Sequence, residues 1–188
     1  TQVEAAEAGA ELLFVHHGMF WGSPARIEGP LLERIRSLLD ADMGLYACHL
    51  PLDMHPEFGN NAQLANLLRL EDRKPFGVYH GVSIGVSGRL KQPRTAEELV
   101  AAILPDNSPP RTLIAAGPER INTLAIVSGG APFEALQALG KGIDAFITGE
   151  PSHSIYHQVV EGGLTFIAAG HYATETWGLR AVEAKLKA

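Results

Sequence analysis

A shortage of cysteine is the first feature of this 188-residue sequence. Its single cysteine, Cys48, excludes an intramolecular disulfide and any zinc site built from several thiolates. Cys48 follows the apolar run Leu45-Tyr46-Ala47, which predicts a buried strand position and an inert, packed thiol. If the chain binds a metal, its eight histidines are therefore the expected ligands.

Long apolar runs and an excess of positive charge are also lacking. No apolar run approaches the roughly 20 residues that a membrane-spanning helix needs, and we find no signal peptide, so we expect a cytoplasmic protein. There are 15 Lys and Arg against 21 Asp and Glu, a net charge of -6. This balance argues against sequence-independent nucleic-acid binding, which needs clustered Lys and Arg. The absence of a His-Glu-x-x-His motif argues against a zincin-type peptidase.

The remaining composition is typical of one sizeable domain, with 46% hydrophobic and 19% charged residues. Short β-rich runs alternate with helical patterns, which predicts an α/β fold. The expected strands are Leu12–His16, Gly44–His49, Gly77–Val86, Thr112–Ala116, Thr123–Val127, Ala145–Thr148 and Thr165–Ala168. The expected helices are Thr1–Ala8, Pro30–Asp40, Asn61–Glu71, Ala96–Leu104, Pro132–Leu139, Ser152–Glu161 and Glu175–Leu186. Thr95 and Glu98 predict a capping box at the start of the helix near residue 96.

A proline-rich stretch, Leu104–Pro110, cannot continue a helix and separates two α/β halves. We expect these halves, about residues 1–92 and 93–188, to pack as a single domain. The chain begins with Thr1 inside a helical pattern. We therefore expect the biological protein to begin earlier and the first strand of the fold to precede Thr1.

Two adjacent histidines, His16 and His17, end the apolar run Leu12–Val15. Such a run predicts a strand buried on both faces, where two imidazoles are poor fillers. Adjacent side chains on a strand point to opposite faces, so the pair can converge only where the strand ends and the chain turns, which Gly18 permits. One buried structural histidine beside an exposed one is the alternative. We favour metal ligation for the pair.

Polar residues also follow other apolar strands. Asp53 lies in a turn, where an Asx-turn or a helix cap explains it as well as metal ligation does. Three neighbours are candidates for orienting a ligand imidazole, namely His49, His55 and Glu57.

His171 and Glu175 lie near the end of the chain. If a helix begins by Tyr172, positions i and i+4 share a face and can hold one ion. The alternative is a histidine beside a helix start, with an acid that the helix dipole favours.

Five of these candidates form a nitrogen and oxygen ligand set that suits Zn, Mn, Fe or Co, namely His16, His17, Asp53, His171 and Glu175. A catalytic zinc takes about three protein ligands, and one carboxylate can bridge two cations about 3.5–4 Å apart. The count therefore favours a dinuclear site. Ser128-Gly129-Gly130 follows a predicted strand and could offer amides to a phosphate, although a tight turn is the favoured interpretation.

These motifs are similar to those of a known family. The chain resembles the NIF-three-like dinuclear metal centre proteins, also described as GTP cyclohydrolase 1 type 2 homologues, from Ala5 to Gly178. The matching segments are Phe14-Val15-His16-His17-Gly18-Met19-Phe20-Trp21, Tyr46-Ala47-Cys48-His49-Leu50-Pro51-Leu52-Asp53, His55-Pro56-Glu57-Phe58-Gly59-Asn60-Asn61, Thr148-Gly149-Glu150 and Gly170-His171-Tyr172-Ala173-Thr174-Glu175.

The resemblance implies that the same five residues bind two divalent ions per chain, drawn from Zn, Fe, Mn, Co or Ni. It also implies a NIF-three-like fold with two α/β halves packed face to face around the site, and a ring-shaped homohexamer whose sites face an inner cavity. Family members usually carry a further N-terminal segment that this sequence lacks. Some carry an inserted domain between the halves, for which the link from Ser87 to Ile121 leaves no room.

Two functions follow as hypotheses. The first is a metal-dependent hydrolase of a small, nucleotide-like substrate, for which GTP ring opening and phosphoester cleavage fit equally well. Either Glu175 or Asp53 would bridge the ions, and the candidates for proton transfer or ligand support are His49, Glu150 and His157. The second is a non-catalytic hexameric scaffold or metal storage and delivery protein, in which bound metals stabilise the fold.

Overall fold

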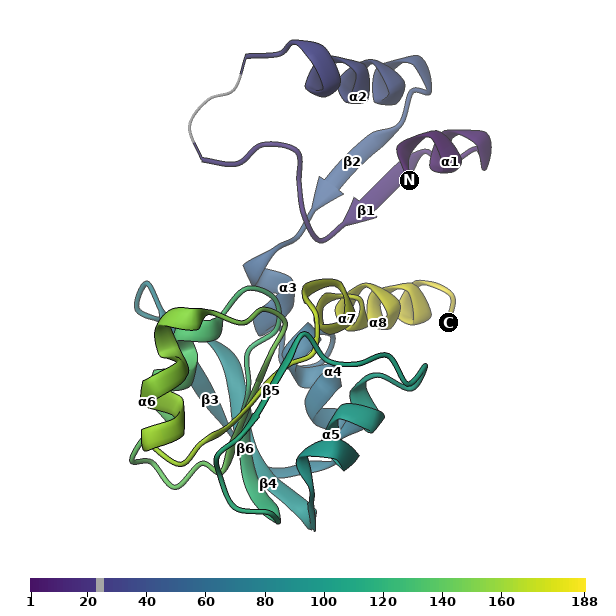
Figure 1. The fold of residues 1–188 in the computed structure, drawn as a ribbon. Helices are drawn as coiled ribbons and strands as arrows, with labels where there is room; N and C mark the ends of the chain where they lie inside the picture. The colour runs from purple at the N-terminus through teal and green to yellow at the C-terminus, as the bar shows by residue number, and fades with distance from the viewer. Residues whose placement is uncertain (23–25) are drawn as a thin grey trace. The chain divides into compact units, whose positions relative to one another are not determined.

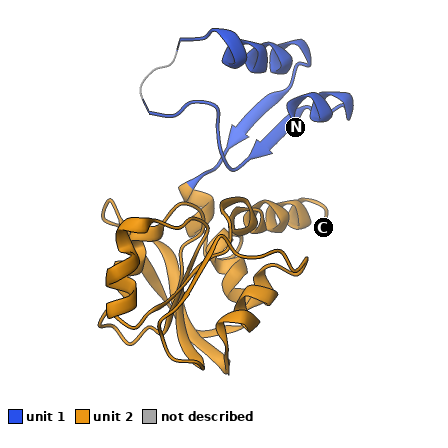
Figure 2. Ribbon diagram, viewed as in Figure 1, with its two compact units in different colours: residues 1–49 blue, residues 50–188 orange. Residues whose placement is uncertain are grey.

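The chain divides into two compact units, Thr1–His49 and Leu50–Ala188 (Figure 2). The computed structural model describes residues 1–22 and 26–188. Sequence patterns place the division near residue 92, which falls inside strand β4 (Val82–Arg94). That strand pairs with β3 (Leu70–Tyr79) on one side and β6 (Ile121–Ile126) on the other. Hydrogen bonding thus joins both sides of the expected boundary in one sheet.

Unit 1 is a small βαβ arrangement. Its elements are α1 (Gln2–Glu7), β1 (Leu12–Val15), α2 (Gly29–Asp40) and β2 (Gly44–Ala47). β1 pairs with β2 in parallel, from Leu12 opposite Gly44 to Val15 opposite Ala47. The expectation of a strand buried on both faces is wrong, because a two-stranded sheet leaves Leu12 62% exposed. Cys48 lies beyond the end of β2 and is half-buried, which also corrects its expected place in a buried strand.

Unit 2 contains a six-stranded mixed sheet in the order β3-β4-β6-β7-β8-β5. The remaining strands are β5 (Thr112–Ala115), β7 (Ala145–Thr148) and β8 (Thr165–Ala168). β6, β7 and β8 run parallel to one another, and β3, β4 and β5 pair in antiparallel fashion at the two sides. The result is the mixed α/β fold that the alternating sequence pattern predicts.

Helices cover both faces of this sheet (Figure 1). Successive strand residues point to opposite faces, so Leu124 packs towards α4 (Asn60–Leu67) and α5 (Ala96–Ile103). Its neighbour Ala125 belongs to the second core, with the 3-10 helix η1 (Pro132–Ala138) and α6 (Tyr156–Glu161). These two apolar layers fix the sheet between its helices.

The capping box expected before α5 is confirmed. The Thr95 hydroxyl accepts from the Glu98 backbone N–H at 3.2 Å, and the Glu98 carboxylate accepts from the Thr95 N–H at 2.8 Å. The remaining helical elements are α3 (Leu50–Met54), η2 (His153–Ile155), α7 (His171–Glu175) and α8 (Trp177–Leu186).

The region from Leu70 to Arg94 differs from the sequence expectation of one strand over Gly77–Val86. It forms a β3–β4 hairpin that turns at His80 and Gly81, whose φ angles are 48° and 82°. Two consecutive positive φ values are the conformation of a tight hairpin turn, and only the second position is a glycine. The predicted helix Asn61–Glu71 also ends earlier, at Leu67, because β3 begins at Leu70.

The parallel strands place three short segments at one edge of the sheet. Ser128 follows β6, Glu150 follows β7 and His171 follows β8. Carboxyl ends of parallel strands share an edge, which is the usual position of sites in open α/β sheets. Among the described helices, none combines the length and apolar character needed to cross a bilayer.

Candidate metal centre

Three histidines gather within unit 1. The ring centroids of His16 and His17 are 4.9 Å apart, and His49 lies 4.9 Å from the first and 5.0 Å from the second. Each ring offers one nitrogen within 4.8 Å of the others. β1 ends at Val15 and β2 at Ala47, so all three rings lie on the segments that leave the parallel pair. The chain turn after β1 thus lets adjacent side chains converge.

The protonation pattern of His16 is fixed by a backbone contact. Its Nδ1 lies 2.9 Å from the Cys48 carbonyl oxygen, which can only accept a hydrogen bond. Nδ1 therefore carries the proton, and Nε2 carries the lone pair that a metal ligand needs. Trp21 packs against the same group, with its ring centroid 4.8 Å from that of His49 and its indole N–H donating to the Gly18 carbonyl at 2.7 Å.

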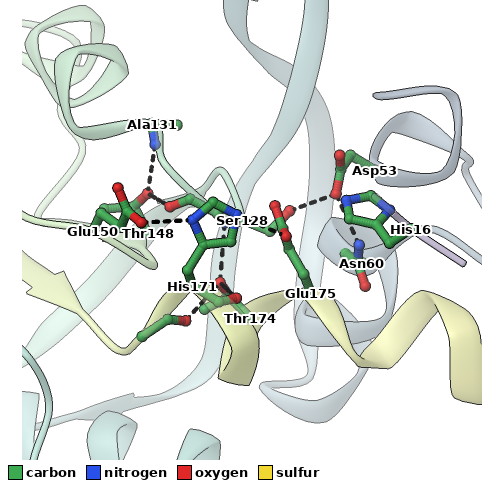
Figure 3. A network of polar contacts seen from close by, with 12 residues as sticks. His16, Asp53, Asn60, Ser128, Ala131, Thr148, Glu150, His171, Thr174 and Glu175 are labelled. Carbon is green, nitrogen blue, oxygen red and sulfur yellow. Dashed lines mark hydrogen bonds and ion pairs between the residues drawn. The ribbon is translucent and has the colours of Figure 1, made fainter. Parts of the chain in front are cut away.

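In unit 2, Asp53 lies on α3 and is held by side chains (Figure 3). Its Oδ1 accepts from the Asn60 amide at 2.8 Å and from the Ser128 hydroxyl at 2.9 Å. The helix that follows, α4, begins after Gly59 and has no side-chain cap. The carboxylate is thus positioned by α4 and by the end of β6 instead of capping a helix.

Two buried asparagines that the sequence interpretation missed as functional brace this carboxylate. The Asn60 side chain also accepts from the Gly178 N–H at 2.7 Å, which connects Asp53 to α8. Asn61 donates to the Ile84 carbonyl at 2.7 Å and accepts from the Ser128 N–H at 2.8 Å. The sequence signal that could have identified them is the pair of consecutive asparagines after Gly59, because a buried asparagine side chain needs several hydrogen-bond partners.

His171 lies between two carboxylates. Its Nε2 is 2.9 Å from Glu175 Oε2, one turn later on α7, and its Nδ1 is 2.7 Å from Glu150 Oε1 (Figure 3). The i, i+4 geometry expected for His171 and Glu175 is therefore present. Glu150 follows β7, so adjacent parallel strands bring it to the other ring nitrogen. A carboxylate behind an imidazole is the usual support of a metal-binding histidine.

The Ser128-Gly129-Gly130 segment is a tight turn that accommodates Glu175. Gly129 has a φ of 70°, and a Cβ atom there would collide with the Glu175 carboxylate. Its N–H donates to the Thr174 hydroxyl at 3.0 Å, and its carbonyl accepts from the Thr148 hydroxyl at 3.0 Å. Because this amide already has a partner, the turn is not built as a phosphate cradle.

Other candidates lie elsewhere. His55 Nδ1 accepts from the backbone N–H groups of Glu57 and Phe58, so the ring stabilises its own turn. His157 is exposed on α6, edge-on to Tyr156 at 5.4 Å. No contact described in the structure joins His157 to Glu150 or His171, and its suggested role in proton transfer stays a prediction.

The donor chemistry of both groups fits a borderline divalent cation. Unit 1 offers three imidazoles, and unit 2 offers Asp53, Glu175 and His171. Imidazole with carboxylate suits Zn, Fe, Mn or Co, and two clustered carboxylates gain from a neighbouring positive charge.

The family model Duf34/NIF3 (NGG1p interacting factor 3) matches residues 1–188. This chain belongs to that family. Proteins named GTP cyclohydrolase 1 type 2 homolog from Deinococcus radiodurans and Halobacterium salinarum are 42% and 44% identical to it. The alignments cover 97% and 96% of this chain, and 70% and 73% of those proteins.

Solved structures of similar proteins have the same fold. The protein ybgI, described as of unknown function, matches with a TM-score of 0.87 and 39% identity, over 99% of this chain and 74% of that one. TTHA1606 from Thermus thermophilus gives 0.84 and 37%, over 99% and 73%. Reduced HcgD from Methanocaldococcus jannaschii gives 0.82 and 26%, over 99% and 73%.

Proposed function

We propose that this chain is a metal-dependent hydrolase of a small, nucleotide-like substrate. The observation that carries the proposal is His171 held between Glu150 and Glu175, beside the braced Asp53, on the carboxyl edge of the sheet. Imidazole and carboxylate groups concentrated at a strand edge, of which Asp53 and Glu175 are buried, are typical of a catalytic metal centre. The names of the curated relatives, GTP cyclohydrolase 1 type 2 homolog, support the same class of reaction.

The proposed ligands are those implied by the family resemblance. They are His16, His17, Asp53, His171 and Glu175, and they hold two divalent cations per chain. When bound, such cations supply Lewis acidity that lowers the pKa of water and polarises the bond under attack.

The chain's own groups have three tasks in this proposal. The Cys48 carbonyl and Glu150 orient the imidazoles of His16 and His171. Glu175 or Asp53 would supply the carboxylate shared by two cations. His49 is the candidate for proton transfer, since it lies beside two ligand rings.

Metal analysis of the purified protein, prepared without chelator, tests the centre. We expect about two equivalents of divalent metal per chain. His16→Ala and Glu175→Ala should each lower this content. His153→Ala and Glu161→Ala, which change the same residue types on exposed positions of η2 and α6, should leave it unchanged. Less than one equivalent in the unaltered protein contradicts the dinuclear proposal.

A substrate panel of GTP, cyclic nucleotides and phosphoesters tests turnover. Activity should fall at least about a hundredfold in Glu175→Ala, as expected when a group stabilising transition-state charge is lost. Activity that is equal in the unaltered protein and both metal-ligand variants belongs to a contaminant. Two bound metals with no turnover on any substrate would instead favour the scaffold or metal-storage function.

The proposed assembly is a cytoplasmic homohexamer, which rests on the family resemblance. Apolar side chains exposed on unit 2, including Val78, Val82 and Phe133, are candidates for subunit contacts. Sedimentation equilibrium should give six times the chain mass of 20.1 kDa. A monomer across the micromolar range would contradict the hexamer and leave the metal proposal standing.

A further inference from the structure

A broad cleft in unit 2 opens beside the His171 and Glu150 pair. Its volume is about 1060 Å³, and its walls come from the segment between α5 and β5, the segments that follow β7 and β8, and the helices α7 and α8. His171 and Glu150 themselves line it. A molecule in this cleft would therefore lie against the imidazole that we propose as a metal ligand.

Two exposed arginines line the cleft from separate elements. Arg111 directly precedes β5, and its backbone N–H donates at 2.8 Å to the carbonyl of Ala168, the last residue of β8. His171 begins α7 three residues after Ala168, so the sheet holds Arg111 beside the strand that leads to the candidate ligand. Arg180 lies on α8.

The ring of Trp177 fixes the position of Arg180. The guanidinium carbon lies 5.9 Å from the ring centroid, and the indole N–H donates to the Ala173 carbonyl at 2.9 Å. A guanidinium over an aromatic face keeps its charge and its outward N–H donors. The highly exposed Tyr172 gives the cleft a flat apolar surface.

The acidic groups of the cleft accept hydrogen bonds from their neighbours, whereas the contacts of Arg180 are with the Trp177 ring and, at longer range, the charge of Glu183. Asp106 accepts from the Ser108 hydroxyl at 2.8 Å and its N–H at 3.2 Å, which lowers the pKa of that carboxyl. Glu150 accepts from His171. Within the part of the chain that the structure describes, neither Arg111 nor Arg180 forms an ion pair. The N–H donors of these two guanidiniums match the oxygens of a phosphate.

We propose that this cleft binds a nucleoside phosphate, with Arg111 and Arg180 on the phosphate and the ring of Tyr172 against the base. This proposal rests on the proposed function and deepens it, because it names the cleft and the side chains that bind the phosphate and the base of the nucleotide-like substrate. The phosphate is held by charge-assisted hydrogen bonds, and stacking on the exposed ring of Tyr172 orients the base.

Calorimetric titrations with GTP, guanosine and inorganic pyrophosphate test the cleft. Arg111→Ala and Arg180→Gln should each weaken GTP and pyrophosphate binding by at least about tenfold, which corresponds to about 1.4 kcal/mol. Guanosine should bind weakly and equally to all variants. Arg36→Ala on α2 is the control, because it removes an exposed arginine outside the cleft. Arg180→Gln keeps much of the aliphatic stem, and thermal melting checks that each variant is folded.

Repeating the titrations with EDTA separates this proposal from the metal centre. We expect the effects of the arginine substitutions to persist without metal, because the positive charge that binds the phosphate comes from the guanidinium groups of Arg111 and Arg180. Effects that persist in EDTA, together with no turnover by the metal-loaded protein, would overturn the hydrolase proposal and leave the cleft standing. Metal-dependent turnover, with GTP affinity changed by less than about twofold in both arginine variants, would overturn the cleft alone. Failure of the unaltered protein to bind GTP or pyrophosphate would also overturn it.

Discussion

At the scale of single residues, Glu150 is a side chain for which the structure favours one of two expected roles. The sequence interpretation leaves proton transfer and support of a ligand open, and its 2.7 Å contact with His171 Nδ1 favours orientation of that imidazole. Loss of such a supporting group typically lowers metal affinity about 10- to 100-fold. We therefore expect Glu150→Ala to weaken metal binding by this factor, and Glu150→Gln, which keeps an accepting oxygen, to restore most of it.

Competitive metal titration distinguishes the two roles of Glu150. Glu161→Ala is the matched control, since it removes an exposed glutamate from α6. If metal affinity stays normal in Glu150→Ala while turnover falls, the residue transfers protons and the orienting role is wrong.

Gly129 allows a second residue-scale prediction with an internal control. Gly129 and Gly140 have nearly the same left-handed backbone, with φ of 70° and 71°. A methyl group at Gly129 collides with the Glu175 carboxylate, whereas nothing lies within 4 Å of one at Gly140. Both alanine substitutions should destabilise the fold by about 1 kcal/mol, because alanine disfavours positive φ.

The two glycine variants should differ in metal content. Gly129→Ala displaces Glu175 and should lose bound metal, while Gly140→Ala should retain it. Measuring both the metal content and the denaturant unfolding of each variant separates loss of metal from loss of stability. Equal metal content in the two folded variants would show that Glu175 is not a ligand.

At the scale of secondary-structure elements, α5 depends on a cap that the sequence predicts. Thr95→Ala removes the hydroxyl that accepts from the Glu98 N–H. We expect the free energy of unfolding to fall by about 1 kcal/mol, because one helix-terminal donor loses its partner. Thr95→Ser retains an accepting oxygen and should recover most of the loss in urea titrations. An unchanged midpoint for Thr95→Ala would mean that the packing of Leu99 and Ile103 alone determines this helix.

Sequence patterns predict the elements best where one local signal dominates. The strands Ala145–Thr148 and Thr165–Ala168 agree to the residue, since both are short apolar runs flanked by turns. The β3–β4 hairpin was not predicted, because one of its two turn positions is His80 and residues on both sides of the turn have strand character. The short helix α3 was also missed, because five residues carry too little periodicity to detect.

In the candidate site, too, sequence patterns predict best the contacts that are local in the chain. His171 and Glu175 share a helix face, so their spacing alone brings them together. The support of Asp53 by Ser128 spans 75 positions and depends on how α3 meets the end of β6. Such a contact is set by sheet topology, which local patterns do not determine.

At the scale of the whole molecule, removal of metal should destabilise the chain. The proposed ligands belong to both compact units, two histidines in the first and three residues in the second. A ligand that binds only the folded state stabilises it by RT ln(1 + [L]/Kd), about 2.7 kcal/mol at a hundredfold excess over Kd. For a chain of this size, that corresponds to a fall of roughly 5–10 °C in Tm on adding EDTA.

Differential scanning calorimetry of the metal-loaded protein measures this shift, and re-addition of Zn or Mn should reverse it. Glu175→Gln is the informative comparison, because it keeps the shape of the side chain and removes the charge that holds the cations. Its Tm should already be lowered and should respond little to EDTA. Glu161→Gln should respond as the unaltered protein does. EDTA could instead lower the Tm of Glu175→Gln as far as that of the unaltered protein. The stabilising metal would then be bound elsewhere, because substitution of a residue that does not contact the ion leaves the stability gained from metal binding unchanged.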